Sequence, residues 1–191
     1  MSAMPMHGRE EHGAVADAAT GPVPGWWRWL LLSAAVIALD LATKAWVMAV
    51  FREGQELPVT GFLSLVLAFN TGAAFSFLAG ASGWQRWFFA GVAIVASVFL
   101  VWMLRRGGSR ALSAGVALIL GGALGNLWDR LTQGRVTDFV LLHYQGWSWP
   151  AFNVADSAIT VGAALLILDS FRARPRVSLL CAFGRRGLDA L

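Results

Sequence analysis

Aspartates in or beside apolar segments are the residues of this sequence best suited to chemistry. Four occur there, Asp40, Asp129, Asp138 and Asp156. An ionised carboxylate near hydrocarbon is energetically unfavourable, so it indicates either a partner or a function. The neighbours of each acid separate those with a structural explanation from those without one.

Two of the acids, Asp40 and Asp129, have polar neighbours that suggest a structural role. Lys44 follows Asp40 by one helical turn, close enough for an ion pair. Asp129 adjoins Arg130, but neighbouring residues on a helix do not face each other, so each should find a partner elsewhere, for example in another span. Asn126 precedes Arg130 by one turn and could hydrogen-bond it or a substrate carbonyl. A polar cluster that holds helices together explains Asn126, Asp129 and Arg130 equally well.

Asp138 and Asp156 have no such local partner. No Lys or Arg lies within four residues of Asp156. Arg135 precedes Asp138 by three, but the intervening residues favour an extended chain, in which an odd spacing points side chains to opposite faces. Two carboxylates within hydrogen-bond reach do not both ionise easily and therefore share a proton. One could then act as base toward a water while the other polarises a peptide carbonyl.

Simpler interpretations of the same residues stay open. Asn153 could cap a helix, with Asp156 in the first turn where a carboxylate favours the positive end of the helix dipole. Asp138 could be a surface acid in a loop. His143 could be a proton shuttle, although its aromatic neighbours favour an interfacial side chain. The pattern makes Asp138 and Asp156 a candidate pair and does not by itself define an enzyme.

The elements that must position these acids are predicted to be membrane spans. The chain has 191 residues, room for one domain, and is 57% hydrophobic and only 14% charged. A soluble domain of this size could not cover so much apolar surface, so the composition indicates an integral membrane protein. The net charge of +4 does not favour a nucleic-acid partner, although a nucleic-acid-binding tail stays open, because the arginines flank apolar segments. The single cysteine, Cys181, cannot form an intramolecular disulfide.

Four segments have the length and composition of a span, which needs about 20 mostly apolar residues. They cover residues 29–51, 87–104, 111–128 and 155–171. Residues 57–79 carry no charge but contain glycine, proline and asparagine, so we expect extended structure at the membrane surface and not a fifth span. Gly121 and Gly125 have the spacing that lets helices approach closely, which implies packing and no chemistry.

The arginines predict the orientation and the limits of the domain. Arg105, Arg106 and Arg110 lie two spans away from the basic residues 172–186, so both clusters should face the cytoplasm, with residues 131–150 outside and both termini cytoplasmic. We expect a disordered leader over 1–25, unlike a cleavable signal peptide. A four-span domain over 26–171 and a basic cytoplasmic tail over 172–191 should follow.

Five short blocks carry a resemblance to a known family. They are DLATK (40–44), NTGAAF (70–75), GGALGNLWDR (121–130), GRVTDF (134–139) and FNVADSAI (152–159). In this order the sequence resembles the bacterial lipoprotein signal peptidases, also called signal peptidase II. The resemblance covers residues 40–159 and none of the leader or tail.

The resemblance implies a mostly α membrane protein with four transmembrane helices and a small extracytoplasmic β-structured part between spans 1 and 2. It implies an aspartic endopeptidase of the bacterial inner membrane that cuts diacylglyceryl-modified prolipoproteins just before the lipidated cysteine. Asp138 and Asp156 would be the catalytic pair at the extracytoplasmic face. Residues expected to bind substrate or support the site are Asp40, Lys44, Asn70, Gly122, Asn126, Asp129, Arg130 and Asn153.

The expected partners are prolipoproteins and membrane lipids, with no nucleic acid, and the expected oligomeric state is a monomer. No cofactor or metal is expected, because one histidine near the spans and one distant cysteine do not make a zinc site of the usual kind. Two other classes compete with an enzyme. A proton- or solute-coupled transporter would use the acids as a relay, although the paired halves common in transporters are absent from the sequence. A non-catalytic scaffold would use the Asp–Arg cluster for packing alone.

Overall fold

The structure is a computed structural model that describes residues 22–72 and 83–172. The predicted leader up to position 21 lies outside these residues, and so does the basic tail beyond Arg172, with Cys181. The last part of the predicted surface segment, from residue 73 on, also lies outside them.

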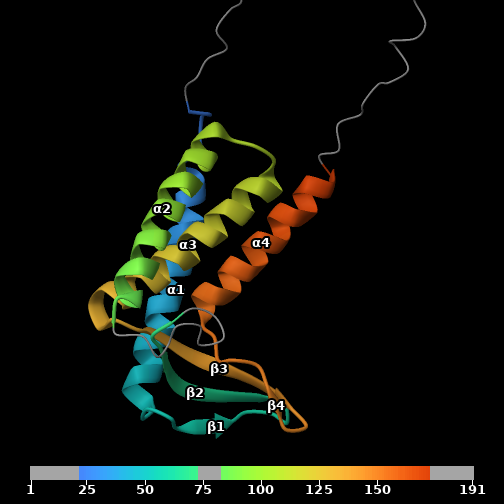
Figure 1. The fold of residues 1–191 in the computed structure, drawn as a ribbon. Helices are drawn as coiled ribbons and strands as arrows, with labels where there is room; N and C mark the ends of the chain where they lie inside the picture. Colours follow the sequence, from blue (N-terminus) through green and yellow to red (C-terminus); the bar gives the residue numbers. More distant parts are fainter. Residues whose placement is uncertain (1–21, 73–82, 173–191) are drawn as a thin grey trace, which may run out of the picture.

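Four helices form the body of the protein. They are α1 (Arg28–Val50), α2 (Gln85–Arg106), α3 (Arg110–Gln133) and α4 (Val154–Arg172), and each is long and apolar enough to cross a membrane. Figure 1 shows the helices above a small sheet, with α3 between α2 and α4. The helix α3 packs against each of the other three. The four predicted spans are therefore confirmed.

The helix α3 extends further than predicted. The expected span ended at residue 128 because Asp129 and Arg130 follow, but the helix continues to Gln133. It can do so because both charged side chains find partners within the protein. Gly134 ends the helix in the left-handed conformation (φ 76°), and its N–H donates to the carbonyl of Arg130. Asn126, Asp129 and Arg130 thus lie on one continuous helix that reaches the sheet.

Glycines let α3 approach both of its neighbours. A Cβ at Gly121 would lie 2.8 Å from the carbonyl oxygen of Ser33 in α1, and one at Gly122 would collide with the carbonyl of Ala155 in α4. A Cβ at Gly125 would lie 2.6 Å from Oδ2 of Asp40. The packing role predicted for Gly121 and Gly125 fits this geometry, and Gly122 makes a similar close contact. This packing brings the polar side chains of α1, α3 and α4 together.

A four-stranded antiparallel sheet lies across one end of the helices (Figure 1). Its strands are β1 (Glu56–Pro58), β2 (Leu63–Asn70), β3 (Val136–Tyr144) and β4 (Trp147–Ser148), in that order. The predicted β-structured part between spans 1 and 2 is confirmed by β1 and β2, and the connection between α3 and α4 adds β3 and β4. Val47 and Phe51 at the end of α1 pack against Leu67 and Phe139 of the sheet.

Pairing of β2 with β3 sets the position of the first candidate acid. Ala68 lies opposite Asp138, and Asn70 lies opposite Val136. The register shifts between Leu65 and Ala68. The extended chain predicted around Asp138 is present, and Asp138 has Asn70 of the adjacent strand as a near neighbour.

Candidate active site

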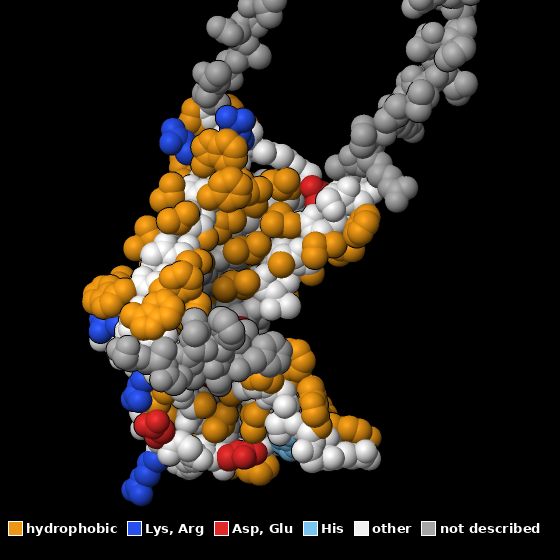
Figure 2. All heavy atoms as spheres, in the orientation of Figure 1, with side chains coloured by type: hydrophobic (Ala, Val, Ile, Leu, Met, Phe, Trp, Pro, Cys, Tyr) orange, Lys and Arg blue, Asp and Glu red, His pale blue; other side chains and the backbone are white. Residues whose placement is uncertain are grey.

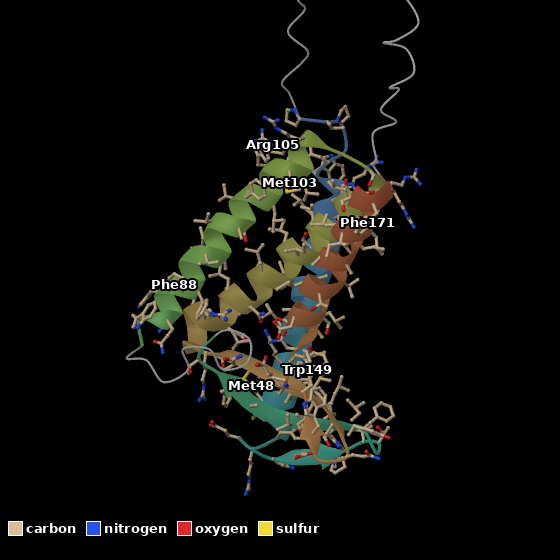
Figure 3. All side chains as sticks on the ribbon, turned by 45° about the vertical axis from the view of Figure 1, so that its right-hand side comes forward. Met48, Phe88, Met103, Arg105, Trp149 and Phe171 are labelled. Carbon is tan, nitrogen blue, oxygen red and sulfur yellow. The ribbon has the colours of Figure 1, made fainter. Side chains whose placement is uncertain are left out.

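A cavity of about 800 Å³ lies where the sheet meets α3 and α4. Five of the predicted site residues border it, namely Asn70, Asn126, Arg130, Asp138 and Asp156. Trp149, labelled in Figure 3 between the sheet and the helices, also borders the cavity. The remaining lining is mostly apolar, so the polar groups are concentrated around the two acids.

Asp138 enters the cavity from β3 and is only 3% exposed. Its Oδ1 accepts a hydrogen bond from Nδ2 of Asn153 at 2.7 Å. Burial, together with the nearby charge of Asp156, raises the pKa of Asp138 to about 7, although hydrogen bonds from Asn153 and Asn70 lower it. This carboxyl can therefore exchange a proton near neutral pH.

Asp156 lies in the first turn of α4 and takes part in a reciprocal cap. Its backbone N–H donates to Oδ1 of Asn153 at 2.9 Å, while its Oδ2 accepts from the backbone N–H of Asn153 at 3.3 Å. Its other oxygen, Oδ1, accepts from Nδ2 of Asn126 at 2.8 Å. The capping interpretation is thus correct for Asp156, and the same carboxylate also borders the cavity.

Asn153 joins the two acids. Its side-chain carbonyl holds the backbone of Asp156, and its side-chain amide donates to the carboxylate of Asp138. In residues 22–72 and 83–172, the two carboxylates have no direct hydrogen bond to each other and no ion pair with Lys or Arg. They share a cavity and interact electrostatically.

Lys44 forms the centre of a second polar group behind the cavity. Its Nζ lies 2.7 Å from Oδ2 of Asp40, 3.1 Å from Oδ2 of Asp129 and 3.0 Å from Oδ1 of Asn126. Lys44, Asp40 and Asp129 are almost completely buried. The predicted pairing of Asp40 with Lys44 is present, and Asp129 finds its partner in another span, as expected. We call Asp40, Lys44 and Asp129 the lysine cluster.

The lysine cluster also holds the backbone next to each candidate acid. Oδ1 of Asp40 accepts from the N–H of Ala155 at 2.9 Å. Oδ2 of Asp129 accepts from the N–H of Thr137 at 3.0 Å. Ala155 precedes Asp156 and Thr137 precedes Asp138, so the cluster fixes the main chain on which both acids stand.

Arg130 is the cation that borders the cavity. Its guanidinium donates to the backbone carbonyls of Asn126 and Gly72, both at 3.3 Å, and lies over the ring of Phe89. It is within electrostatic reach of Asp138 and Asp156. The predicted contact between Arg130 and Asn126 is made through the backbone of Asn126, which leaves the Asn126 amide for Asp156.

Two further predicted residues lie outside the cavity lining. Gly122 is at the contact of α3 with α4. His143 binds the buried Ser64 through Nε2 at 2.9 Å. It lies five residues from Asp138 along β3, roughly 17 Å in an extended strand, so a proton-shuttle role is not supported.

Sequence reasoning did not select the apolar side chains of the cavity. They include Phe69, Leu142, Trp149, Phe152, Ile159 and Val161. Their only sequence signal is an apolar type in an apolar protein, which does not distinguish a cavity from a lipid-facing surface. In the described ranges, no three His, Cys, Asp or Glu side chains group as metal ligands.

The fold and this cavity define a multi-pass membrane protein with a polar site at the junction of its helices and a surface sheet. Residues 32–172 match the family model for signal peptidase (SPase) II. The chain belongs to the signal peptidase II family, which makes it a bacterial membrane protease.

Related proteins agree over most of the chain. The lipoprotein signal peptidase of Ralstonia nicotianae is 54% identical over 145 residues, 75% of this chain and 84% of the relative. That of Yersinia enterocolitica is 51% identical over 146 residues, 75% of this chain and 86% of the relative.

Solved structures share the fold. A bacterial membrane enzyme determined by the in meso method at 1.9 Å superposes with a TM-score of 0.71 at 26% identity, covering 82% of this chain and all (100%) of the other. A second such structure, at 2.3 Å, gives a TM-score of 0.71 at 28% identity, covering 81% of this chain and 93% of the other.

Proposed function

We propose that this protein removes signal peptides from prolipoproteins by an aspartic mechanism, with Asp138 and Asp156 as the catalytic pair. Cleavage falls just before the cysteine that carries diacylglycerol. The observation that carries the proposal is the shared cavity, in which two carboxylates from different elements meet, neither of them in an ion pair with Lys or Arg of the described residues. The apolar lining beside them suits a lipid-bearing substrate.

The reaction begins with one proton on the pair. Asp138, with its pKa near 7, carries this proton and donates it to the oxygen of the scissile carbonyl. A water attacks the carbonyl carbon and gives a proton to Asp156, which produces a tetrahedral diol. The carbon–nitrogen bond then breaks as Asp156 protonates the departing amine. Asp138 regains its proton from one hydroxyl of the diol, and the pair returns to its starting state.

The neighbouring polar residues support this chemistry in different ways. Asn126 and Asn153 keep the oxygens of Asp156 and Asp138 in place by direct hydrogen bonds. Arg130 and Asn70 border the cavity and bind backbone carbonyls of the substrate. The lysine cluster fixes the main chain behind the acids, and Gly122 permits the helix contact that brings α4 close.

The same proposal includes an orientation. The arginine-rich end of the helices faces the cytoplasm, and the sheet and cavity face the opposite side of the bacterial inner membrane. Residues 26–171 form the peptidase unit, which acts as a monomer, with both chain termini on the cytoplasmic side. At the outer surface, a substrate anchored by its lipid and a water from the aqueous phase can both reach the acids.

Incubation of purified protein with a diacylglyceryl-modified prolipoprotein tests the proposal directly. Wild-type protein should release the signal peptide, and Asp138→Asn and Asp156→Asn should each abolish release while the protein still elutes and unfolds as a folded species. A transporter or a scaffold would release no peptide. Equal release by wild type and both variants would refute the aspartic assignment.

A further inference from the structure

The end of the helices opposite the sheet carries a concentration of arginines. Arg28 begins α1, Arg105 and Arg106 end α2, and Arg110 begins α3. Figure 2 shows Lys and Arg side chains gathered at this end, where Figure 3 labels Arg105. In the described parts of the chain none of the four forms an ion pair with a carboxylate. The positive charge of these four arginines is therefore not neutralised by an ion pair within the described residues.

Two of these arginines border a cavity of about 400 Å³. Its lining consists of Pro24, Gly25, Arg28, Trp29, Gly108, Arg110 and Ser113. Both charged members of the lining are arginines, and Ser113 is a buried hydroxyl at 4% exposure. We call this the arginine cavity.

The wall of the arginine cavity is held in place by contacts around it. The backbone N–H of Val23 donates to the carbonyl of Arg105 at 2.9 Å, which ties the chain before α1 to the end of α2. Arg105 itself lies over the ring of Trp26, and Arg106 lies over Trp102 at 4.3 Å. Arg105 and Arg106 do not line the cavity. Arg28, which does, also lies over an aromatic ring, that of Trp27 at 5.8 Å.

The surrounding tryptophans indicate the depth of the arginine cavity in a membrane. Trp27 and Trp102 are half exposed at the end of the spans. Tryptophan prefers the layer of lipid head groups, so the cavity opens at that level. A guanidinium offers paired N–H donors that match the oxygens of a phosphate. Basic pockets between transmembrane helices are known to take anionic lipid head groups.

We propose that the arginine cavity binds the phosphodiester head group of an anionic phospholipid, with Arg28 and Arg110 as its phosphate ligands and Ser113 as a further donor. Among the described residues, Asp169 is an acid near this end of the fold, and it accepts a hydrogen bond from Ser109 at 2.6 Å. This site is separate from the proposed catalytic cavity, at the other end of the helices, and does not depend on the peptidase assignment.

Native mass spectrometry of the full chain in an uncharged detergent tests the proposal. Phosphatidylglycerol and phosphatidylcholine are added at equal concentration, and the lipid retained by the protein is measured. Wild type should retain phosphatidylglycerol in preference. The double variant Arg28→Gln/Arg110→Gln should lose at least about tenfold of this preference, because both guanidinium groups that would hydrogen-bond the phosphate are removed.

A matched variant distinguishes a defined site from a diffuse basic surface. Arg105→Gln/Arg106→Gln removes the same number of charges from the same end but leaves the cavity lining intact, so it should keep most of the preference. An equal loss in both double variants would overturn the defined site. Equal retention of the two lipids by wild type would overturn lipid selectivity altogether.

A soluble anion is the other source of a phosphate. Inorganic phosphate and glycerol 3-phosphate at millimolar concentration should not displace phosphatidylglycerol, because they have no acyl chains to hold them at the membrane surface. Displacement by either would assign the arginine cavity to a soluble anion and refute the lipid.

A circular-dichroism spectrum and a melting curve of each variant show whether a lost preference comes with lost folding. If the double variant is unfolded, Arg28→Lys/Arg110→Lys, which keeps the charge but not the planar fork, should show a smaller loss in a folded protein, and an unchanged preference in that variant would refute phosphate recognition by the guanidinium pair.

Discussion

Asp40 and Asp129 differ from Asp138 and Asp156 in what meets their oxygens. The first two share the ammonium group of Lys44 and are not among the residues that line the site cavity. The second two accept hydrogen bonds from neutral amides and open onto a cavity. Asp138 is nearly as buried as Asp129, at 3% against 1% exposure. Burial alone thus does not distinguish the two kinds of carboxylate; their partners and their access to the cavity do.

The two pairs are also connected through the main chain. Asp40 accepts a hydrogen bond from the backbone N–H of Ala155, the residue before Asp156. Asp129 accepts one from the N–H of Thr137, the residue before Asp138. Asp40 and Asp129, the neutralised pair, can be buried and rigid because Lys44 compensates their charge. Asp138 and Asp156, the open pair, form no ion pair with a Lys or Arg of the described residues, and the main chain before each of them is held by Asp129 and Asp40.

The largest effect is expected from Asp138→Asn, which removes the proton donor of the open pair. Turnover of a diacylglyceryl-modified prolipoprotein should fall by about 10³-fold or more, in the upper range for loss of general acid–base catalysis. Signal-peptide release measured by gel shift provides the test. Glu56→Gln, an exposed acid on β1, is the control and should leave turnover unchanged. Near-normal turnover in Asp138→Asn would remove this acid from the mechanism.

Lys44→Ala breaks the neutralised pair. It leaves Asp40 and Asp129 buried without their cation, which should lower the free energy of unfolding by about 3–5 kcal/mol. Turnover of the fraction that stays folded should be affected less than stability, because the N–H groups of Ala155 and Thr137 keep Asp40 and Asp129 as their acceptors. Thermal unfolding in detergent and cleavage are measured on the same sample. Unchanged thermal stability would show that the ion pair does not stabilise the fold.

Asn153 lies where the two pairs meet, and two substitutions separate its roles. Asn153→Ala should lower the free energy of unfolding by about 1 kcal/mol through loss of the helix cap. Turnover should fall by about 10²-fold, within the range for a positioning error near the reacting groups. Asn153→Ser can still cap α4 but has no amide for Asp138, so it should restore stability and not turnover. Recovery of both by serine would reduce Asn153 to a cap.

The pH dependence of activity and of stability tests the raised pKa of Asp138. Asp138 must carry a proton in the proposed mechanism, and its pKa is raised from 3.8 to about 7, so kcat/KM should fall up to tenfold per pH unit above about pH 7. The folded state holds this proton more tightly than the unfolded state does. The stability contributed by Asp138 is therefore complete below about pH 4 and is lost as pH rises to about 7. Asp138→Asn should flatten unfolding free energy over that window. An equal slope in both proteins would contradict the raised pKa.

The smallest effect is expected at an exposed ion pair, which sharpens the contrast with Lys44. Arg135 lies 3.8 Å from Glu53, with the Glu53 side chain 65% exposed and that of Arg135 39% exposed. Glu53→Gln should change the free energy of unfolding by less than about 1 kcal/mol, because water screens such a pair. The measurement is the same detergent unfolding curve. A loss as large as that of Lys44→Ala would mean that exposure does not govern the strength of ion pairs here.

The spans could be predicted because each is a local apolar segment. The apolar span predicted at residues 111–128 is shorter than α3. The sequence indicated that Asp129 and Arg130 lie on a helix, but it could not show their distant partners, Lys44 and the carbonyl of Gly72. The pairing of Ala68 with Asp138 is similarly non-local. Asp156 shows a different limit. Its local pattern predicted a cap correctly, but one oxygen bonds Asn126 in another helix.

The five sequence blocks gave the set of expected site residues, and the structure shows which of these residues contact one another. Local spacing predicted the contact between Asp40 and Lys44, since both lie on one helix. It could not predict that Asp40 and Asp129 hold the backbone of two later segments. That information resides in the close packing of α3 on α1 and α4, to which the glycines at 121, 122 and 125 contribute without identifying their partners.

The order of the strands in the chain has a consequence for biosynthesis. Asp138 lies on β3 and Asp156 at the start of α4, and β3 pairs with a strand made before α2 and α3. On the proposed assignment, a growing chain holds no complete hydrolytic centre until its fourth helix leaves the ribosome and is inserted. Peptide-bond cleavage thus begins only once membrane integration is finished, so a half-made copy cannot cut its neighbours in the bilayer.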